Sequence, residues 1–476
     1  MIFSSIPFLY YFLPLALLLC YLVPSRARNA FLLLASLVFY AWGEPKYLPV
    51  MAAATALGYG FGLAIQRFRR FRKPLLVLSI ASSLGFLLYF KYADFFLENL
   101  NGLGGNIPLL GLALPVGISF YTFQILSYTV DVYRGEVRAQ RNLIDLACYV
   151  TFFPQLIAGP IVRYKDIAAQ LRDRPQNLDN LRLGAARFLV GLGKKVLLAN
   201  LLGEVCAAWR VTADPSVLFS WLYALSYTLH IYFDFSGYSD MAVGISHMLN
   251  ITLPMNFDSP YQSLNIRDFW KRWHRSLTGF FTKYLYIPLG GSRKGLARTC
   301  INTLLVFLVS GLWHGTGRTF LLWGLLNGLL MIFDRLTERW QKTLFAPFRW
   351  LLTFGIINVL WLLFRADSVH QWLSALFTLF SMQSTQISQG LLACFELKEL
   401  NLLASKLPLG FLFSNVRGVF LNLYLLLGLA LCLGCRNNYR RMDKKLTFTD
   451  LVLTIIAFTW SLICLGGETT FVYAWF

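Results

Sequence analysis

The feature that most constrains this chain is a series of apolar runs that approach the length an α-helix needs to cross a bilayer. A spanning segment must satisfy its backbone hydrogen bonds internally, so such runs favour helices. Of the 476 residues, 57% are hydrophobic and only 14% are charged. The sequence therefore predicts an all-α polytopic membrane protein. The candidate spans are 6–24, 29–42, 48–65, 74–90, 110–130, 217–235, 300–313, 319–333, 347–364, 418–435 and 449–466.

Short basic loops set the predicted orientation. Cations gather at 25–28, at 67–73 and at 436–445, each between two candidate spans. Because cytoplasmic loops are enriched in Lys and Arg, these joints are expected inside and the N-terminus outside. The net charge of +20 then reflects topology and contact with anionic membrane lipid. No nucleic-acid partner is predicted. The stretch 369–417, with shorter apolar pieces, is expected to form peripheral helices on the outer side.

The eight cysteines are scattered, mostly inside apolar runs. Their spacing matches neither a disulfide framework nor a zinc site, so no metal centre is expected. The apolar run at the N-terminus lacks a basic leader region and a small-residue cleavage site, and it is expected to be a first span.

One apolar segment, 146–161, is interrupted by Pro154, Gly159 and Pro160 and has arginines on both sides. Prolines break helices, and flanking cations on both sides indicate entry and exit on the same face. We therefore expect a re-entrant segment. Broken backbone at membrane depth has to lie within protein or line a cavity, which makes this segment a candidate wall of a central site. A proline-kinked span is the alternative.

Two carboxylates lie in the aromatic, serine-rich stretch 232–240, which closes the candidate span 217–235. Asp234 and Asp240 are placed to orient a histidine or a substrate hydroxyl. Ser, Asp and Gly also end and cap helices, so a plain helix end fits the same residues equally well.

A basic amphipathic segment covers 268–285. With a helical period, its aromatic residues share one arc and its cations Lys271, Arg272, Arg275 and Lys283 lie opposite. This pattern is typical of a helix in a membrane interface. His274 lies at the border of the aromatic arc. The helix is expected to break at Pro288 and the Gly290–Gly291 pair.

The next span ends in Gly-Leu-Trp-His-Gly at 311–315, which places His314 in an apolar run without a charged neighbour. An ionisable side chain at membrane depth is a functional candidate, because burying it costs free energy that packing does not require. A histidine bonded to a backbone carbonyl at a helix end is the alternative.

Five ordered motifs together resemble those of the membrane-bound O-acyltransferase (MBOAT) family. They are Leu114–Gln124 (LPVGISFYTFQ), Phe153–Pro160 (FPQLIAGP), Tyr232–Asp240 (YFDFSGYSD), Asp268–His274 (DFWKRWH) and Gly311–Gly315 (GLWHG). The resemblance covers essentially the whole chain. Within the family it is greatest to the alginate O-acetyltransferases and related bacterial polysaccharide and peptidoglycan O-acetyltransferases.

The resemblance implies one integral membrane domain over 1–476, with its core motifs in 114–325. It also implies about 11 transmembrane helices, with re-entrant and interfacial helices around a central funnel. The family's invariant histidine matches His314, and a second functional histidine matches His274. Family members take an activated acyl group on the cytoplasmic side, with acetyl-CoA as the expected donor and no bound cofactor. The expected acceptor is an extracytoplasmic polysaccharide, the expected partner a separate periplasmic acetyltransferase, and the expected location the bacterial inner membrane.

Acyl transfer to a hydroxyl needs a base for the proton and a donor for the oxyanion. We expect His314 to be the base and His274 to orient the donor or transfer a second proton. Expected binding residues are Trp270, Trp273, Lys271, Arg272, Trp313 and Asp234. Two alternatives remain at this level: D-alanyl transfer to teichoic acid, and a transporter of polysaccharides or small molecules.

Overall fold

The computed structural model describes residues 1–212, 216–381, 427–430 and 448–463, and all regular structure in these ranges is helical. Five of the described helices are long and apolar enough to cross a membrane: Pro45–Arg67, Arg69–Gly102, Gly295–His314, Arg318–Leu336 and Ala346–Arg365. The prediction of an all-α membrane protein is confirmed. The predicted number of about eleven spans stays a prediction, since most of 418–435 and the basic run 436–445 lie outside the described residues, as does 382–417.

The chain divides into two compact units. The first contains Met1–Phe188 and Tyr238–Met255. Its helices are η1 (Pro7–Phe12), α1 (Leu13–Leu22), α2 (Arg28–Ala41), α3 (Leu48–Arg67), α4 (Arg72–Gly102), α5 (Ile118–Arg134), α6 (Leu143–Thr151), α7 (Phe153–Leu156), α8 (Tyr164–Arg172) and most of α9 (Leu178–Gly193). Helices α3, α4 and α5 pack against one another. Glycines permit this: a Cβ on Gly58 or Gly62 of α3 would lie 2.6 Å from side-chain atoms of Ile125 or Tyr128 of α5.

In the first unit, one predicted helix start is wrong and one predicted helix break is confirmed. The span expected at 110–130 is wrong at its start, because α5 begins only at Ile118. Before it, Gly117 takes a left-handed φ of 79°, and a Cβ there would lie 2.5 Å from the Leu156 carbonyl oxygen. The break expected within 146–161 is confirmed. Helix α6 stops at Thr151, α7 lasts one turn, and the chain from Gly159 to Arg163 is not helical.

The second unit contains Leu189–Gly237 and the chain from Asn256 onward. Its helices are η5 (Lys194–Ala199), α10 (Asn200–Val211), most of α11 (Val217–Met248), α12 (Ile266–Arg272), α13 (Arg275–Phe281), η7 (Thr282–Tyr286), α14 (Leu296–His314), α15 (Arg318–Leu336), α16 (Glu338–Gln341), α17 (Ala346–Arg365), α18 (Val369–Phe380) and α24 (Phe448–Ile463). The expected break at Pro288 and the two glycines is confirmed as the turn between η7 and α14.

The helix end expected near 232–240 is wrong. Helix α11 continues without interruption to Met248. Close packing explains the glycine in this stretch, because a Cβ on Gly237 would lie 2.8 Å from the carbonyl oxygen of Gly191. The glycine therefore allows a close backbone approach and does not end the helix.

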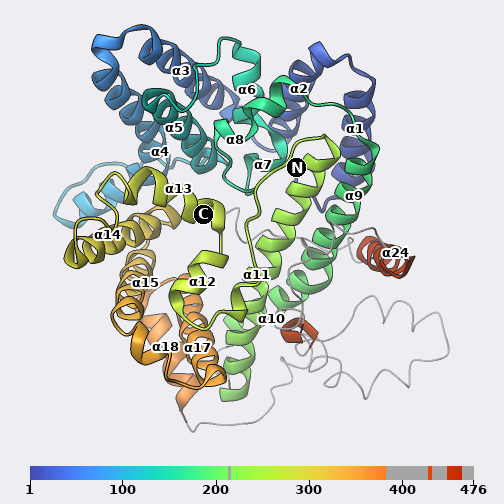
Figure 1. Cartoon of the computed structure of the whole chain (residues 1–476). Helices are drawn as coiled ribbons and strands as arrows, with labels where there is room; N and C mark the ends of the chain where they lie inside the picture. Colours follow the sequence, from blue (N-terminus) through green and yellow to red (C-terminus); the bar gives the residue numbers. More distant parts are fainter. Residues whose placement is uncertain (213–215, 382–426, 431–447, 464–476) are drawn as a thin grey trace. The chain divides into compact units, whose positions relative to one another are not determined.

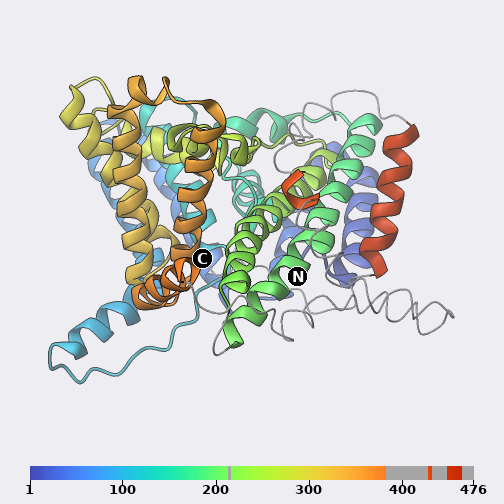
Figure 2. The same ribbon diagram turned by 90° about the horizontal axis from the view of Figure 1, so that it is seen from below.

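Helices α14 and α15 form a close antiparallel pair, with α17 beside α15 (Figures 1 and 2). A Cβ on Gly311 would collide with the backbone carbonyl of Phe320, and one on Gly324 with that of Phe307. Small residues that let helix backbones approach closely are a common device in membrane proteins. The first glycine of the 311–315 motif therefore serves packing, and it fixes the helix that carries His314.

Replacing Gly311 tests this packing. In Gly311→Ala the new methyl group meets a backbone carbonyl that cannot rotate away, so we expect a loss of about 1–3 kcal/mol in stability. Gly355→Ala in α17 is the matched control, because its Cβ would meet no atom within 4 Å. Thermal unfolding of the purified proteins in detergent gives the measurement. Equal unfolding temperatures for the two variants would contradict the packing role.

Candidate functional site

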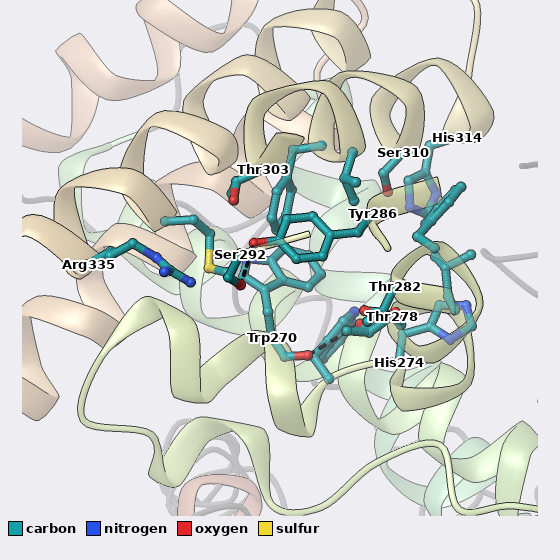
Figure 3. A pocket seen from close by; sticks show the side chains of 16 residues that line it. Trp270, His274, Thr278, Thr282, Tyr286, Ser292, Thr303, Ser310, His314 and Arg335 are labelled. Atoms are coloured by element: carbon teal, nitrogen blue, oxygen red, sulfur yellow. Dashed lines mark hydrogen bonds between the residues drawn. The ribbon is translucent and has the colours of Figure 1, made fainter. Parts of the chain in front are cut away.

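The second unit contains a cavity of about 230 Å³ that both histidines of the sequence motifs line. Its walls come from α12, α13, η7, α14 and α15. Figure 3 shows the lining side chains, which are Trp270, Trp273, His274, Leu277, Thr278, Phe281, Thr282, Tyr286, Ser292, Thr303, Val306, Phe307, Ser310, His314, Met331 and Arg335.

His314 is the last residue of α14 and is 5% exposed. Three aromatic rings surround its imidazole. The ring of Trp313 lies 4.7 Å away, that of Trp323 5.3 Å and that of Phe364 5.1 Å, between ring centroids. Edge-to-face contacts of this kind hold a ring in one orientation. The apolar surroundings expected for His314 are therefore present, and they come from α14, α15 and α17.

His274 lies in a turn between α12 and α13, so the continuous helix expected over 268–285 is wrong. Its backbone is left-handed, with φ 43° and ψ 54°, which is uncommon for a residue with a Cβ. Hydrogen bonds from a distant segment explain the break. The Arg275 amide donates to the Asn256 carbonyl (2.9 Å), and the Asp258 amide donates to the Arg272 carbonyl (3.0 Å). These bonds replace helical ones at the turn.

Asn256 also fixes the protonation of the His274 ring. The Asn256 Oδ1 atom accepts from the Ser276 amide at 3.4 Å, and a backbone N–H can only donate. The atom facing the imidazole is therefore an oxygen, and His274 Nδ1 must donate a hydrogen to it across 3.0 Å. In the neutral ring, Nε2 then carries the lone pair. Burial lowers the pKa of His274 to about 3, so the ring is neutral at physiological pH.

Two of the expected binding residues line the cavity. Trp270 and Trp273 come from α12 and its end. The Trp270 indole N–H donates to Asn327 Oδ1 on α15 (3.1 Å), which ties α12 to that helix. Trp313 is not among the lining residues, yet its ring lies 6.4 Å from that of His274 as well as beside His314.

The expected charged residues lie elsewhere. Lys271 is exposed, and Arg272 pairs with Asp268 one helical turn earlier (3.0 Å). Asp234 is buried and pairs with Lys195 of η5 at 2.5 Å, with both side chains 2% exposed. The structure therefore brings His274, His314, Trp270 and Trp273 together, and it places Lys271, Arg272 and Asp234 away from the cavity lining.

Several lining residues did not stand out in the sequence. Thr303, Ser310 and His314 lie on one face of α14, seven and four residues apart. Polar residues at helical spacing within an apolar run were the available signal. Met331 and Arg335 of α15 belong to the same cavity and gave no signal, because α15 reads as an ordinary span.

One family model and several known proteins match this chain. The family model described as MBOAT, membrane-bound O-acyltransferase family, matches residues 109–388. A probable alginate O-acetylase AlgI of Pseudomonas putida is 42% identical over 400 residues, covering 82% of each chain. A peptidoglycan O-acetyltransferase of Helicobacter pylori is 36% identical over 416 residues, covering 79% of each. A teichoic acid D-alanyltransferase of Bacillus subtilis is 29% identical over 251 residues, covering 50% of this chain and 62% of its own.

The buried neutral His274 predicts acid sensitivity. Its pKa is about 3 in the folded protein and ordinarily 6.5, so between these values the unfolded chain binds a proton that the folded chain excludes. Stability therefore falls as the pH drops below 6.5, by about 2 kcal/mol at pH 5 from this group. In His274→Gln the decrease in unfolding temperature between pH 7.5 and pH 5 should be smaller than in the wild type. Equal decreases would contradict a buried neutral imidazole.

The buried pair of Lys195 and Asp234 predicts a loss of stability when one of the two charges is removed. Asp234→Asn removes the carboxylate and leaves a buried ammonium, which should cost about 3–5 kcal/mol in stability. Asp166→Asn is the control, because its pair with Arg163 is about one-third exposed and should contribute less than about 1 kcal/mol. Thermal unfolding of both variants is the measurement. The double variant Lys195→Met with Asp234→Leu should be more stable than Asp234→Asn, because it removes both charges. If it is not, the unpaired ammonium is not the cause of the loss of stability.

Proposed function

Because the chain belongs to the membrane-bound O-acyltransferase family, we propose that it passes acetyl from a cytoplasmic thioester to the hydroxyl of an extracytoplasmic polysaccharide. It is a multi-pass membrane enzyme that transfers acyl groups, which answers the transporter alternative. The observation that carries the proposal is that two buried histidines from separate sequence motifs, His274 and His314, line one cavity.

The names of the relatives support acetyl as the acyl group. The relatives that match most of both chains are called alginate O-acetylase and peptidoglycan O-acetyltransferase. The D-alanyltransferase matches half of this chain at lower identity. The proposed acceptor is therefore an alginate-like exopolysaccharide, cellulose or peptidoglycan in the bacterial cell envelope, reached directly or through a periplasmic transferase.

The charge along α14 supports the proposed direction of transfer. Arg293, Lys294 and Arg298 gather at the start of this helix, and His314 ends it. Cations of this density favour the cytoplasmic face. The donor, proposed to be acetyl-CoA, then enters the cavity from the basic end, and the acceptor approaches the end that carries His314.

The proposed reaction balances without a covalent enzyme intermediate. His314 takes the proton of the acceptor hydroxyl as its oxygen attacks the thioester carbonyl carbon. The new C–O bond forms, the C–S bond breaks, and the leaving thiolate receives the proton. Ser310, one turn before His314 in the cavity wall, supplies a hydroxyl for the oxyanion. The Nε2 lone pair of neutral His274 supports a role in accepting a hydrogen bond that orients the donor.

Transfer of labelled acetyl from acetyl-CoA by the purified protein in detergent tests the proposal. The wild type should release label to water, acceptor or a periplasmic partner. His314→Ala should lose about 10²-fold or more in rate, because the base is gone, and His274→Ala should also lose activity. His370→Ala is the control, since His370 is exposed on α18. No acetyl turnover by the wild type with a partner present, or normal turnover by His314→Ala, would overturn the mechanism.

A further inference from the structure

The cavity has a cation at the end away from the histidines. Figure 3 shows Arg335 on one side of the cavity and His274 and His314 on the other. Arg335 lies one residue before the end of α15 and is half-buried. Apart from the two histidines, it is the one basic side chain among the cavity's lining residues within the described part of the chain.

The acidic residues next to Arg335 already bind other groups. Asp334 accepts a hydrogen bond from the Arg267 amide (3.0 Å), and Glu338 pairs with the Arg267 guanidinium and the Lys342 ammonium, at 2.8 and 2.9 Å. Within the described residues, no hydrogen bond or ion pair involves the Arg335 side chain. Its five N–H donors are therefore available to an anion in the cavity.

The position of Arg335 along the helix pair indicates from which side such an anion comes. Gly324 lies against Phe307 and Gly328 against Leu304, so the two helices run in opposite directions. Arg335 therefore lies level with the start of α14, where Arg293, Lys294 and Arg298 gather. This is the end assigned to the cytoplasm, from which the donor is proposed to enter.

The wall between the two ends suits a thin chain with amide groups. Hydroxyls of Thr278, Thr282, Tyr286, Ser292 and Thr303 line it, beside the apolar side chains of Val306, Phe307 and Met331. Thr303 and His314 alone are eleven residues apart on α14, which corresponds to about 16 Å. A phosphopantetheine arm has this chemistry: a thioester at one end, two amides and a branched apolar carbon within, and a phosphate at the other end.

We propose that Arg335 binds the phosphate of the donor's phosphopantetheine arm and thereby holds the thioester at the histidines. The inference rests on the proposed function and adds the group by which the donor is recognised. A guanidinium binds a phosphate through two parallel hydrogen bonds, which lysine cannot reproduce. The same phosphate occurs in coenzyme A and in a carrier protein's arm, so either source satisfies the site. Arg335 therefore selects phosphate-bearing donors over shorter thioesters.

Donor preference tests the inference. Wild type, Arg335→Ala and Arg335→Lys are assayed with acetyl-CoA, with an acetylated carrier protein and with acetyl-pantetheine, which lacks the phosphate. In Arg335→Ala the ratio of kcat/KM for a phosphate-bearing donor to that for acetyl-pantetheine should fall about tenfold or more, mainly through KM. Arg335→Lys should recover part of the ratio. If the ratio falls only for acetyl-CoA, or only for the carrier protein, the phosphate site is supported and that donor is identified as the source of the phosphate.

Arg339→Ala is the matched control, because Arg339 is an exposed arginine four residues further along the chain, in α16, and does not line the cavity. Its donor ratio should equal that of the wild type. An unchanged ratio in Arg335→Ala, or an equal loss with all three donors, would overturn the role of Arg335 and leave the proposed function standing. No turnover of any donor by the wild type would overturn both.

Discussion

The close contact of α14 with α15 is the constraint on which the site depends. Gly311 of α14 lies against a backbone carbonyl oxygen of α15, and Gly324 of α15 lies against one of α14. This close approach brings the rings of His314 and Trp323 into contact. Helix α12 is then held along α15, through Trp270 to Asn327 and through the Arg267 amide to Asp334. The cavity is the space that remains between these helices.

Two buried polar pairs inside this unit join residues that are far apart in the sequence. Lys195 with Asp234 and His274 with Asn256 each satisfy a buried group with a partner that is distant in the sequence or on another helix. An unsatisfied polar group at such depth would cost several kcal/mol. The same rule draws attention to Arg335, since the two acids beside it already bind Arg267 and Lys342.

The sequence predicted what depends on local periodicity. Apolar runs gave the helical membrane fold, and the motif at 311–315 identified His314. The sequence misplaced features that depend on distant partners. The helix over 268–285 breaks because the backbone of 256–258 bonds to it. Gly237 lies inside α11 because it allows a close approach to Gly191, and it does not end the helix. Neither partner is visible in the local pattern. Arg335 was missed for the same reason, as only the folded chain brings the end of α15 to the cavity.

The left-handed backbone at His274 has a consequence for how this position can vary. Glycine and asparagine tolerate that conformation most readily, whereas β-branched residues are strongly disfavoured in it. The backbone conformation at 274 therefore restricts which side chains can stand beside the cavity at this turn. Histidine is one of the few residues with a Cβ that adopt this conformation comparatively often, so residue 274 can form the turn and present an imidazole at the same time.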